Sequence, residues 1–116
     1  MTVRDDLQVA LTEAMKAQDS TAVGALRSAL AAIANAEAVP ITIVPAAGAI
    51  EAAVGLGAAE AERLLLTDDE QREVVEFEIN ERLSAITDYE THGRSDASEK
   101  LKHEVATLQA VLADEG

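Results

Sequence analysis

Apolar side chains recur every three or four residues along the first part of the chain, which is the spacing of one face of an α-helix. The pattern predicts a helix from about Val3 to Ala17 and a second helix that runs to about Glu37. Between them, Gln18–Ser20 breaks the pattern, and its last two residues are both suitable N-caps for the second helix. A connection this short makes neighbouring helices antiparallel, so we expect a first helical hairpin over residues 1–37.

The last fifty residues carry the clearest helix signals in the chain. Thr67 followed by Glu70 fits a capping box, in which each side chain accepts a hydrogen bond from the other residue's backbone N–H. The helix that starts there is expected to end at Gly93, because glycine readily takes the left-handed conformation that closes helices, and Ser95 is placed to cap the next helix. Each of the two helices has a narrow apolar stripe, formed by Val75, Ile79, Leu83 and Ile86 on the first and by Leu101, Val105, Leu108 and Leu112 on the second. We therefore expect a second antiparallel hairpin over residues 67–116, and an all-α fold of four main helices packed as a small bundle.

Residues 38–66 do not continue the helical pattern. Pro40 and Pro45 bracket the β-branched run Ile41–Val44, which disfavours a helix there, whereas Ala58–Leu65 is compatible with a short helix. A long irregular connection is unusual in a small domain, and it is typically either a mobile insertion or a binding loop. Both interpretations stay open, and in the second the Ile41–Val44 run contacts a partner.

Composition and charge narrow the classes of fold and partner. The 116 residues are enough for a single domain with a modest core. Aromatic residues make up only 2% of the chain, so this core has to be built from Leu, Ile, Val and Ala, which suits closely packed helices. The net charge is −13, and most of it lies in residues 67–116. Such a surface repels phosphate backbones, and it is also ordinary for solvated helix faces.

The sequence offers little catalytic chemistry. It contains no cysteine, which excludes disulfides and thiolate chemistry. Neither His92 nor His103 has a second ligand at the spacing of a metal site, so we expect no metal and no cofactor. No run of about 20 apolar residues and no secretory signal pattern occurs in the sequence, so we expect a cytoplasmic protein that does not enter a membrane.

Three charged residues next to the predicted apolar faces are the candidates for a site. Arg27 directly follows Leu26 in the second helix, and Arg82 lies four residues after Glu78, which is the spacing of a favourable helix pair. Arg27, Glu78 and Arg82 form either structural salt bridges between helices or the lining of a polar groove for a ligand or partner. A small enzyme with an unrecognised site near these three residues is one version of the second interpretation.

Several short motifs occur in an order that is typical of one family. Ala14–Asp19 reads AMKAQD and is followed by Leu26–Leu30 and Asn35–Glu37, and Leu66–Glu70 reads LTDDE. This order resembles that of the YqeY-like proteins of the GatB/YqeY family, over nearly the whole chain apart from about residues 39–57. The matching positions in the last two predicted helices are Glu78, Ile79, Arg82, Tyr89, Gly93, Arg94, Glu104 and Leu108.

The resemblance implies one all-α domain over residues 1–116 and a link to tRNA-dependent amidation. In that reaction a carbon–nitrogen ligase uses glutamine as the amide donor, and the family is related to the tail region of the B subunit of the glutamine-dependent tRNA amidotransferase. Members usually continue into a second small helical domain, which we expect this chain to lack after Gly116. No amidotransferase active site maps onto the sequence, so the expected role is a non-catalytic accessory or interaction module with a protein partner.

Direct tRNA binding by an accessory factor is an alternative function. The resemblance makes tRNA a candidate partner, whereas the net charge of −13 disfavours it. Binding of this kind weakens steeply as the salt concentration rises, because it depends on cations that contact phosphates. A tRNA-binding face would have to gather the scattered cations Arg27, Arg63, Arg82, Arg94, Lys100 and Lys102.

Overall fold

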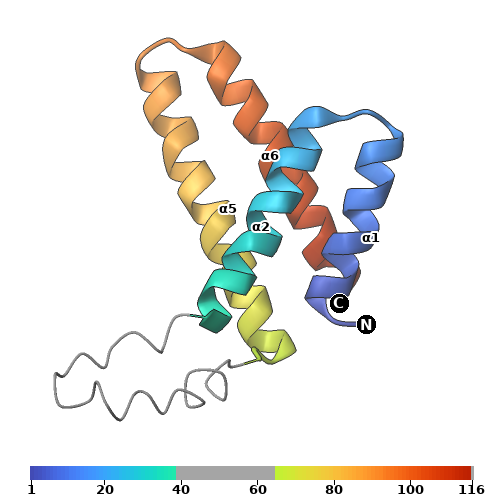
Figure 1. The fold of residues 1–116 in the computed structure, drawn as a ribbon. Helices are drawn as coiled ribbons and strands as arrows, with labels where there is room; N and C mark the ends of the chain where they lie inside the picture. Colours follow the sequence, from blue (N-terminus) through green and yellow to red (C-terminus); the bar gives the residue numbers. More distant parts are fainter. Residues whose placement is uncertain (39–64, 116) are drawn as a thin grey trace, which may run out of the picture.

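The computed structural model describes residues 1–38 and 65–115, and these two stretches form four α-helices and no strand. Helices α1 (Val3–Lys16) and α2 (Ser20–Ala38) make one antiparallel hairpin, and α5 (Asp68–Thr91) and α6 (Ser95–Glu115) make the other (Figure 1). The prediction of an all-α fold built from two helical hairpins is therefore confirmed. The long irregular loop and the short helix predicted between the hairpins lie outside the described residues.

Both hairpins begin with the same local device. The hydroxyl of Thr2 accepts a hydrogen bond from Asp5 N at 3.1 Å, and the hydroxyl of Thr67 accepts one from Glu70 N at 3.1 Å. In each case the acidic side chain accepts in return from the threonine N–H, which completes a capping box. These bonds satisfy N–H groups that have no partner inside the helix, and they fix where α1 and α5 start.

The tight turns are also set by local residues. Asp19 Oδ1 accepts from Ala22 N at 3.1 Å and caps α2, while Gln18, with a φ of 57°, provides the left-handed residue after α1. Gly93, with a φ of 71°, provides it between α5 and α6, as its place in the sequence predicts. Ser95 was expected to cap α6 but is instead the first residue of that helix, and its hydroxyl makes no capping bond to a described residue.

Aliphatic side chains from all four helices build the core. On α2, Ala22, Ala25 and Ala29 are buried, and such small side chains let neighbouring helices approach closely. Each large aliphatic side chain removed from water contributes about 1.5–3 kcal/mol. The largest fully buried apolar side chains are Val3, Leu7, Leu26, Ile33, Val75 and Leu108.

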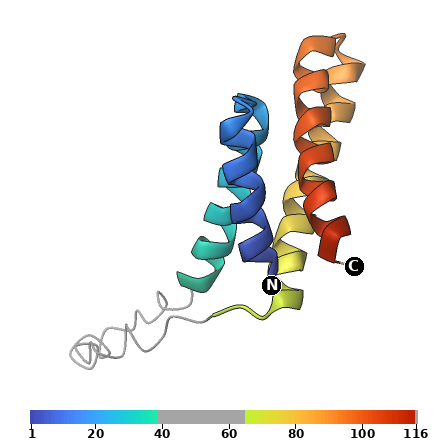
Figure 2. The ribbon, with the colours of Figure 1, turned by 90° about the vertical axis from the view of Figure 1, so that its right-hand side faces the viewer.

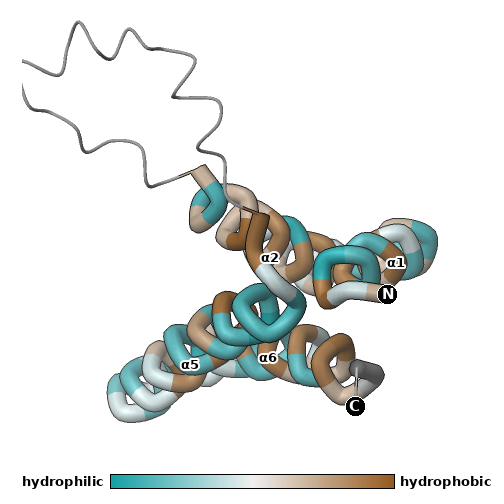
Figure 3. Tube along the Cα trace, turned by 90° about the horizontal axis from the view of Figure 1, so that it is seen from below, coloured by the Kyte–Doolittle hydropathy of each residue, from teal (hydrophilic) through white to brown (hydrophobic). Residues whose placement is uncertain are grey.

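The two hairpins pack against each other as two layers (Figure 2). Helix α2 contacts all three other helices, and between the layers it packs most extensively against α6 and next against α5. Seen from below, α2 lies at the junction of the two pairs (Figure 3). Helix α2 therefore forms the larger part of the first hairpin's contact with the second.

Backbone groups at the start of α1 are bound by side chains at the start of α5. Val3 N donates to Asp68 Oδ1 at 2.6 Å, and Arg4 N donates to Gln71 Oε1 at 2.8 Å. Both N–H groups belong to the first turn of α1, so they have no partner within that helix. Helix α5 thus supplies part of the cap of α1 and fixes the position of one hairpin against the other.

A buried carboxylate strengthens the same end of the bundle. Glu37, near the end of α2, is almost fully buried, and its Oε2 accepts from Arg4 Nη2 at 2.5 Å and from Leu66 N at 3.0 Å. One carboxylate therefore joins α1, α2 and the residues that lead into α5. The chain leaves the first hairpin and enters the second at neighbouring points.

Candidate functional site

The structure brings two of the three predicted site residues together. Arg82 Nη1 lies 3.0 Å from Glu78 Oε1, at the helix spacing expected from the sequence. Arg27 is exposed and makes no ion pair with a described residue. Its neighbour Ser28 faces α5 instead, and Ser28 Oγ donates to Glu78 Oε1 at 3.0 Å. Consecutive residues of a helix point about 100° apart, so only one of the two can face α5.

A residue of α6 completes this cluster. Arg82 Nε lies 2.7 Å from Glu104 Oε1, and the side chains of Arg82, Glu78 and Glu104 are only 14%, 19% and 15% exposed. Burial acts to lower the pKa of Arg82, but the hydrogen bonds to Glu104 and Glu78 outweigh it, so the pKa rises above its ordinary value. Each of these side chains is paired with another member of the cluster, which is the arrangement of a structural clamp between helices.

Glu104 and Ser28 are the members of the cluster that sequence reasoning missed. A usable signal exists for Glu104, because it lies as far after Gly93 as Arg82 lies before it. In an antiparallel hairpin, residues equally far from the turn are neighbours. No comparable signal exists for Ser28, because its contact with Glu78 depends on how the two hairpins pack.

The cluster also changes the predicted apolar stripe of α5. Leu83, which was expected in the core, is 43% exposed, so that prediction is wrong. Both Ile79–Leu83–Ile86 and Ile79–Arg82–Ile86 fit helical spacing, and hydropathy alone selects the leucine. The carboxylates of Glu78 on α5 and Glu104 on α6 instead hold Arg82 on the inner side of the helix.

A histidine contact joins the hairpins at another point. His103 Nε2 of α6 lies 2.7 Å from Asp19 Oδ2 in the turn between α1 and α2. The hydrogen bond with His103, followed by the one from Ala22 N, holds the pKa of Asp19 below its ordinary value. Within residues 1–38 and 65–115, no group of three or more His, Asp or Glu side chains could hold a metal ion. In the same stretches, no helix is both long enough and apolar enough to cross a membrane.

The cations that a tRNA-binding face would need differ in whether they are paired with carboxylates. Arg63 lies outside the described residues, and Arg27 and Lys100 are exposed without an ion pair to a described residue. A cation that is already paired offers less charge to a phosphate. Those paired with carboxylates are Arg82, Arg94 and Lys102.

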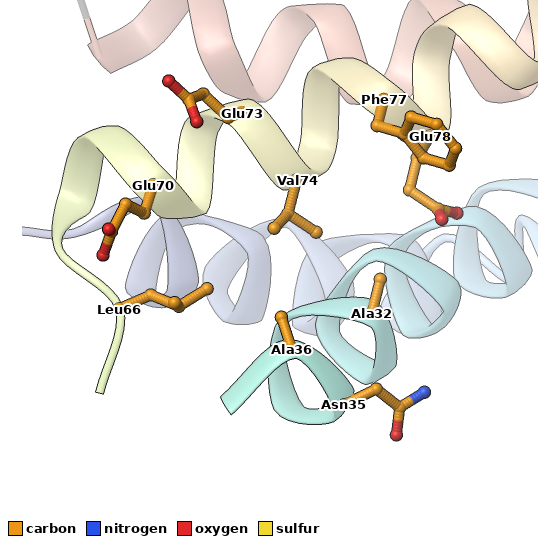
Figure 4. A pocket seen from close by; sticks show the side chains of 9 residues that line it. All are labelled: Ala32, Asn35, Ala36, Leu66, Glu70, Glu73, Val74, Phe77 and Glu78. Atoms are coloured by element: carbon orange, nitrogen blue, oxygen red, sulfur yellow. The ribbon is translucent and has the colours of Figure 1, made fainter. Parts of the chain in front are cut away.

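A groove of about 610 Å³ runs between α2 and α5 (Figure 4). On the α2 side it is lined by Ala32 and Ala36, whose short side chains leave the space open. On the α5 side, Val74 points from its helix toward the two alanines, and Phe77 lies at the edge with 62% of its surface exposed. Leu66 closes the end beside the first turn of α5. The inner surface of the groove is therefore mainly apolar.

The rim of this groove is acidic on one side. Glu70, Glu73 and Glu78 line it from α5, whereas the α2 side contributes only the neutral polar residue Asn35. Glu78 belongs to the buried cluster, and one oxygen of Glu70 accepts from Thr67 N at 2.9 Å. Glu73 is exposed and makes no ion pair with a described residue. An apolar floor thus lies beside an acidic edge on which Glu73 is paired with no cation of the described residues.

Comparison with known proteins gives no match to a family model and none to a curated protein. The family resemblance and the function that it implies therefore stay predictions, and the case for a function has to come from the groove and the clusters described above.

Proposed function

We propose that the chain is a non-catalytic helical interaction module that acts through a protein partner, in the setting of tRNA-dependent amidation that its resemblance to YqeY-like proteins implies. The observation that carries the proposal is the exposed Phe77 beside the apolar groove between α2 and α5. Aromatic side chains that fit a partner's surface supply a large part of binding energy in protein interfaces. A large exposed ring at the edge of an apolar groove is therefore a reasonable anchor for a partner.

The polar groups of the groove support a binding role better than a catalytic one. Catalysis by general acids, bases or nucleophiles needs convergent groups with a free position toward the substrate. Here Glu78 is held by Ser28 and Arg82, and Glu70 is engaged in the capping box. The remaining polar residues that line the groove are Glu73 and Asn35, which offer no hydroxyl, amine or imidazole group.

The charge of the groove supports a protein partner better than RNA. The carboxylates on its rim repel a phosphate backbone, and the net charge of −13 acts in the same direction over longer distances. Two cations of α5 lie close to the groove along the sequence. Arg72 lies 3.8 Å from Glu76 and donates to Leu112 O, and Arg82 is mostly buried between two carboxylates. Little positive charge is therefore offered to a nucleic acid at this surface.

The proposal is tested with purified glutamine-dependent tRNA amidotransferase and mischarged Glu-tRNA. We expect the chain to co-sediment with the amidotransferase in the absence of tRNA, to change the rate of amidation, and to form no amide when the enzyme is left out. Phe77→Ser should weaken the association, and Leu83→Ser, which removes another exposed apolar side chain of α5, should not.

Three results would contradict the proposal in different ways. A salt-sensitive shift with free tRNA would favour direct RNA binding. Amide formation by the chain alone would make it an enzyme. If the chain neither associates with the amidotransferase nor changes the rate of amidation, tRNA-dependent amidation is not its setting.

A further inference from the structure

The groove between α2 and α5 also has features that specify its occupant. We infer that this occupant is a basic amphipathic helix of a partner protein, with its apolar face on Val74 and Phe77 and its lysines or arginines beside the glutamates of α5. The inference rests on the proposed function, since it assigns the chemistry of the partner at the same groove.

The shape of the groove suits a helix. Its walls are two helices, and the stretch of α5 from Glu70 to Phe77 is about two turns, or about 10 Å, long. An amphipathic helix binds such a groove through apolar side chains at positions i, i+3 or i+4, and i+7, which span the same length. The gap left by Ala32 and Ala36 opposite Val74 gives these side chains a place to enter.

The negative charge of the rim lies on its α5 side, and this indicates where the partner carries its basic residues. Glu73 lies one turn before Phe77 on α5, and Glu81 lies one turn after it, so both flank the exposed ring on the same face. Both glutamates are exposed and make no ion pair with a described residue. The groove-lining part of α2 is uncharged. A partner helix therefore gains most if its basic residues lie along the edge that faces α5.

Other occupants fit less well. A second copy of the chain would bring another net charge of −13 toward this acidic rim, and anionic lipid or RNA would be repelled for the same reason. A small polar ligand would need free hydrogen-bonding groups inside the groove, but its lining there is Ala32, Ala36 and Val74. A segment that is both apolar and basic matches the floor and the rim together.

The test uses the full chain and two helical peptides of about 16 residues. Both carry leucines along one face, and the remaining positions are mainly lysine in the first peptide and mainly glutamate in the second. Isothermal titration calorimetry at low salt should show the lysine peptide binding at least about tenfold more tightly than the glutamate peptide, and the difference should shrink as salt screens the rim.

Matched variants show whether the groove is the binding surface. Phe77→Ser should weaken binding of the lysine peptide by about tenfold or more, because it removes the aromatic anchor at the edge of the groove, and Leu83→Ser on another part of α5 should leave it unchanged. Glu73→Lys should weaken it by about three- to tenfold. Asp88→Lys makes the same change in net charge about three turns, or about 16 Å, beyond Phe77. At about 0.1 M salt, where the screening length is about 10 Å, it should have little effect. Circular dichroism spectra show that each variant is folded.

Several results would overturn the inference. Equal binding of the two peptides would show that charge does not select the partner. Binding that is unchanged in both Phe77→Ser and Glu73→Lys would show that the groove is not the binding surface. Its failure is distinguishable from failure of the proposed function. If the lysine peptide binds at the groove but the amidotransferase does not bind the chain, the function fails and the inference stands. If the amidotransferase binds both groove variants as well as the unmodified chain, the inference fails and the function stands.

Discussion

Two clusters of one cation and two carboxylates join α5 to α6, and they differ mainly in burial. In the inner cluster, Arg82 lies 3.0 Å from Glu78 and 2.7 Å from Glu104, and all three side chains are less than one-fifth exposed. In the outer cluster, Lys102 lies 2.7 Å from a carboxylate of α5 and 3.3 Å from one of α6, and its own side chain is 46% exposed. The charges have the same arrangement, but water reaches only the outer cluster freely.

The difference shows what a charge pattern contributes to the fold. The outer cluster, formed by Lys102, Glu90 and Glu99, is solvated, and exposed pairs of this kind contribute about 0–1 kcal/mol. In the inner cluster, removal of the cation would leave two carboxylates close together with little water to screen them. We therefore expect the inner cluster to hold α5 and α6 together and the outer cluster to be nearly dispensable.

The largest expected effect on stability comes from removing the cation of the inner cluster, and removing that of the outer cluster is the matched comparison. Arg82→Met should lower the free energy of unfolding by about 2–4 kcal/mol, whereas Lys102→Met should lower it by less than about 1 kcal/mol. Urea denaturation followed by circular dichroism measures both. If Arg82→Met does not fold, the triple variant that adds Glu78→Gln and Glu104→Gln should restore folding, because it removes the unpaired charges. Equal losses in the two single variants would contradict the distinction between the clusters.

A smaller effect on stability is expected at Glu37, the buried carboxylate that contacts Arg4 of α1 and the backbone of Leu66. Glu37→Ala removes the acceptor of Leu66 N and the partner of Arg4, and an orphaned buried polar group costs about 1–3 kcal/mol. Glu13→Ala, at an exposed position of α1, is the matched control and should change stability by less than about 0.5 kcal/mol. A Glu37→Ala variant as stable as this control would show that the bundle does not depend on the contact.

The third prediction concerns acid and the contact between Asp19 and His103. The pKa of Asp19 is lowered in the folded chain, so its ionised form stabilises the fold at pH values above the ordinary pKa of 3.8, and this stabilisation is lost as the pH falls through the lowered value. An NMR titration of the Asp19 carboxyl should give a pKa below 3.8, which moves back toward 3.8 in His103→Ala. An unchanged pKa in the variant would rule out the histidine as the main cause.

The smallest expected effect on stability is at the groove. Phe77 is mostly exposed, so Phe77→Ser should change the free energy of unfolding by no more than about 0.5 kcal/mol. The same variant should strongly weaken binding of the lysine peptide. Denaturation and calorimetry on one sample would thus separate a residue used for binding from one used for folding, and a loss of more than about 2 kcal/mol would place Phe77 in the core instead.

The features of the fold that follow from local contacts could be predicted from the sequence. The capping box at Thr67 and the left-handed Gly93 depend on residues a few positions apart, so the helix boundaries they set were correct. The pair Glu78–Arg82 is also local, because it lies one turn apart on α5. Its burial was not predictable, because hydropathy favoured Leu83 as the inward residue and does not register the carboxylates that hold Arg82.

The groove could not have been predicted from the pattern of either hairpin alone. Its two walls belong to different hairpins, and Ala32 and Ala36 appear in the sequence as ordinary residues of an alanine-rich helix. Phe77 is not one of the residues in the apolar stripe that the sequence predicts for this helix. What makes these residues a candidate site is the packing of α2 beside α5, which leaves space over the alanines and places the ring at its edge.

Two-dimensional ¹H–¹⁵N NMR on the full chain can map directly where the lysine peptide binds. A peptide seated in the groove should perturb the amide signals of Ala32–Ala36 and Glu70–Glu78 most strongly, and it should leave those around the outer cluster unchanged. Perturbations that gather along the outer face of α1, or no perturbation at millimolar peptide, would contradict the assignment of this groove as the partner-binding surface.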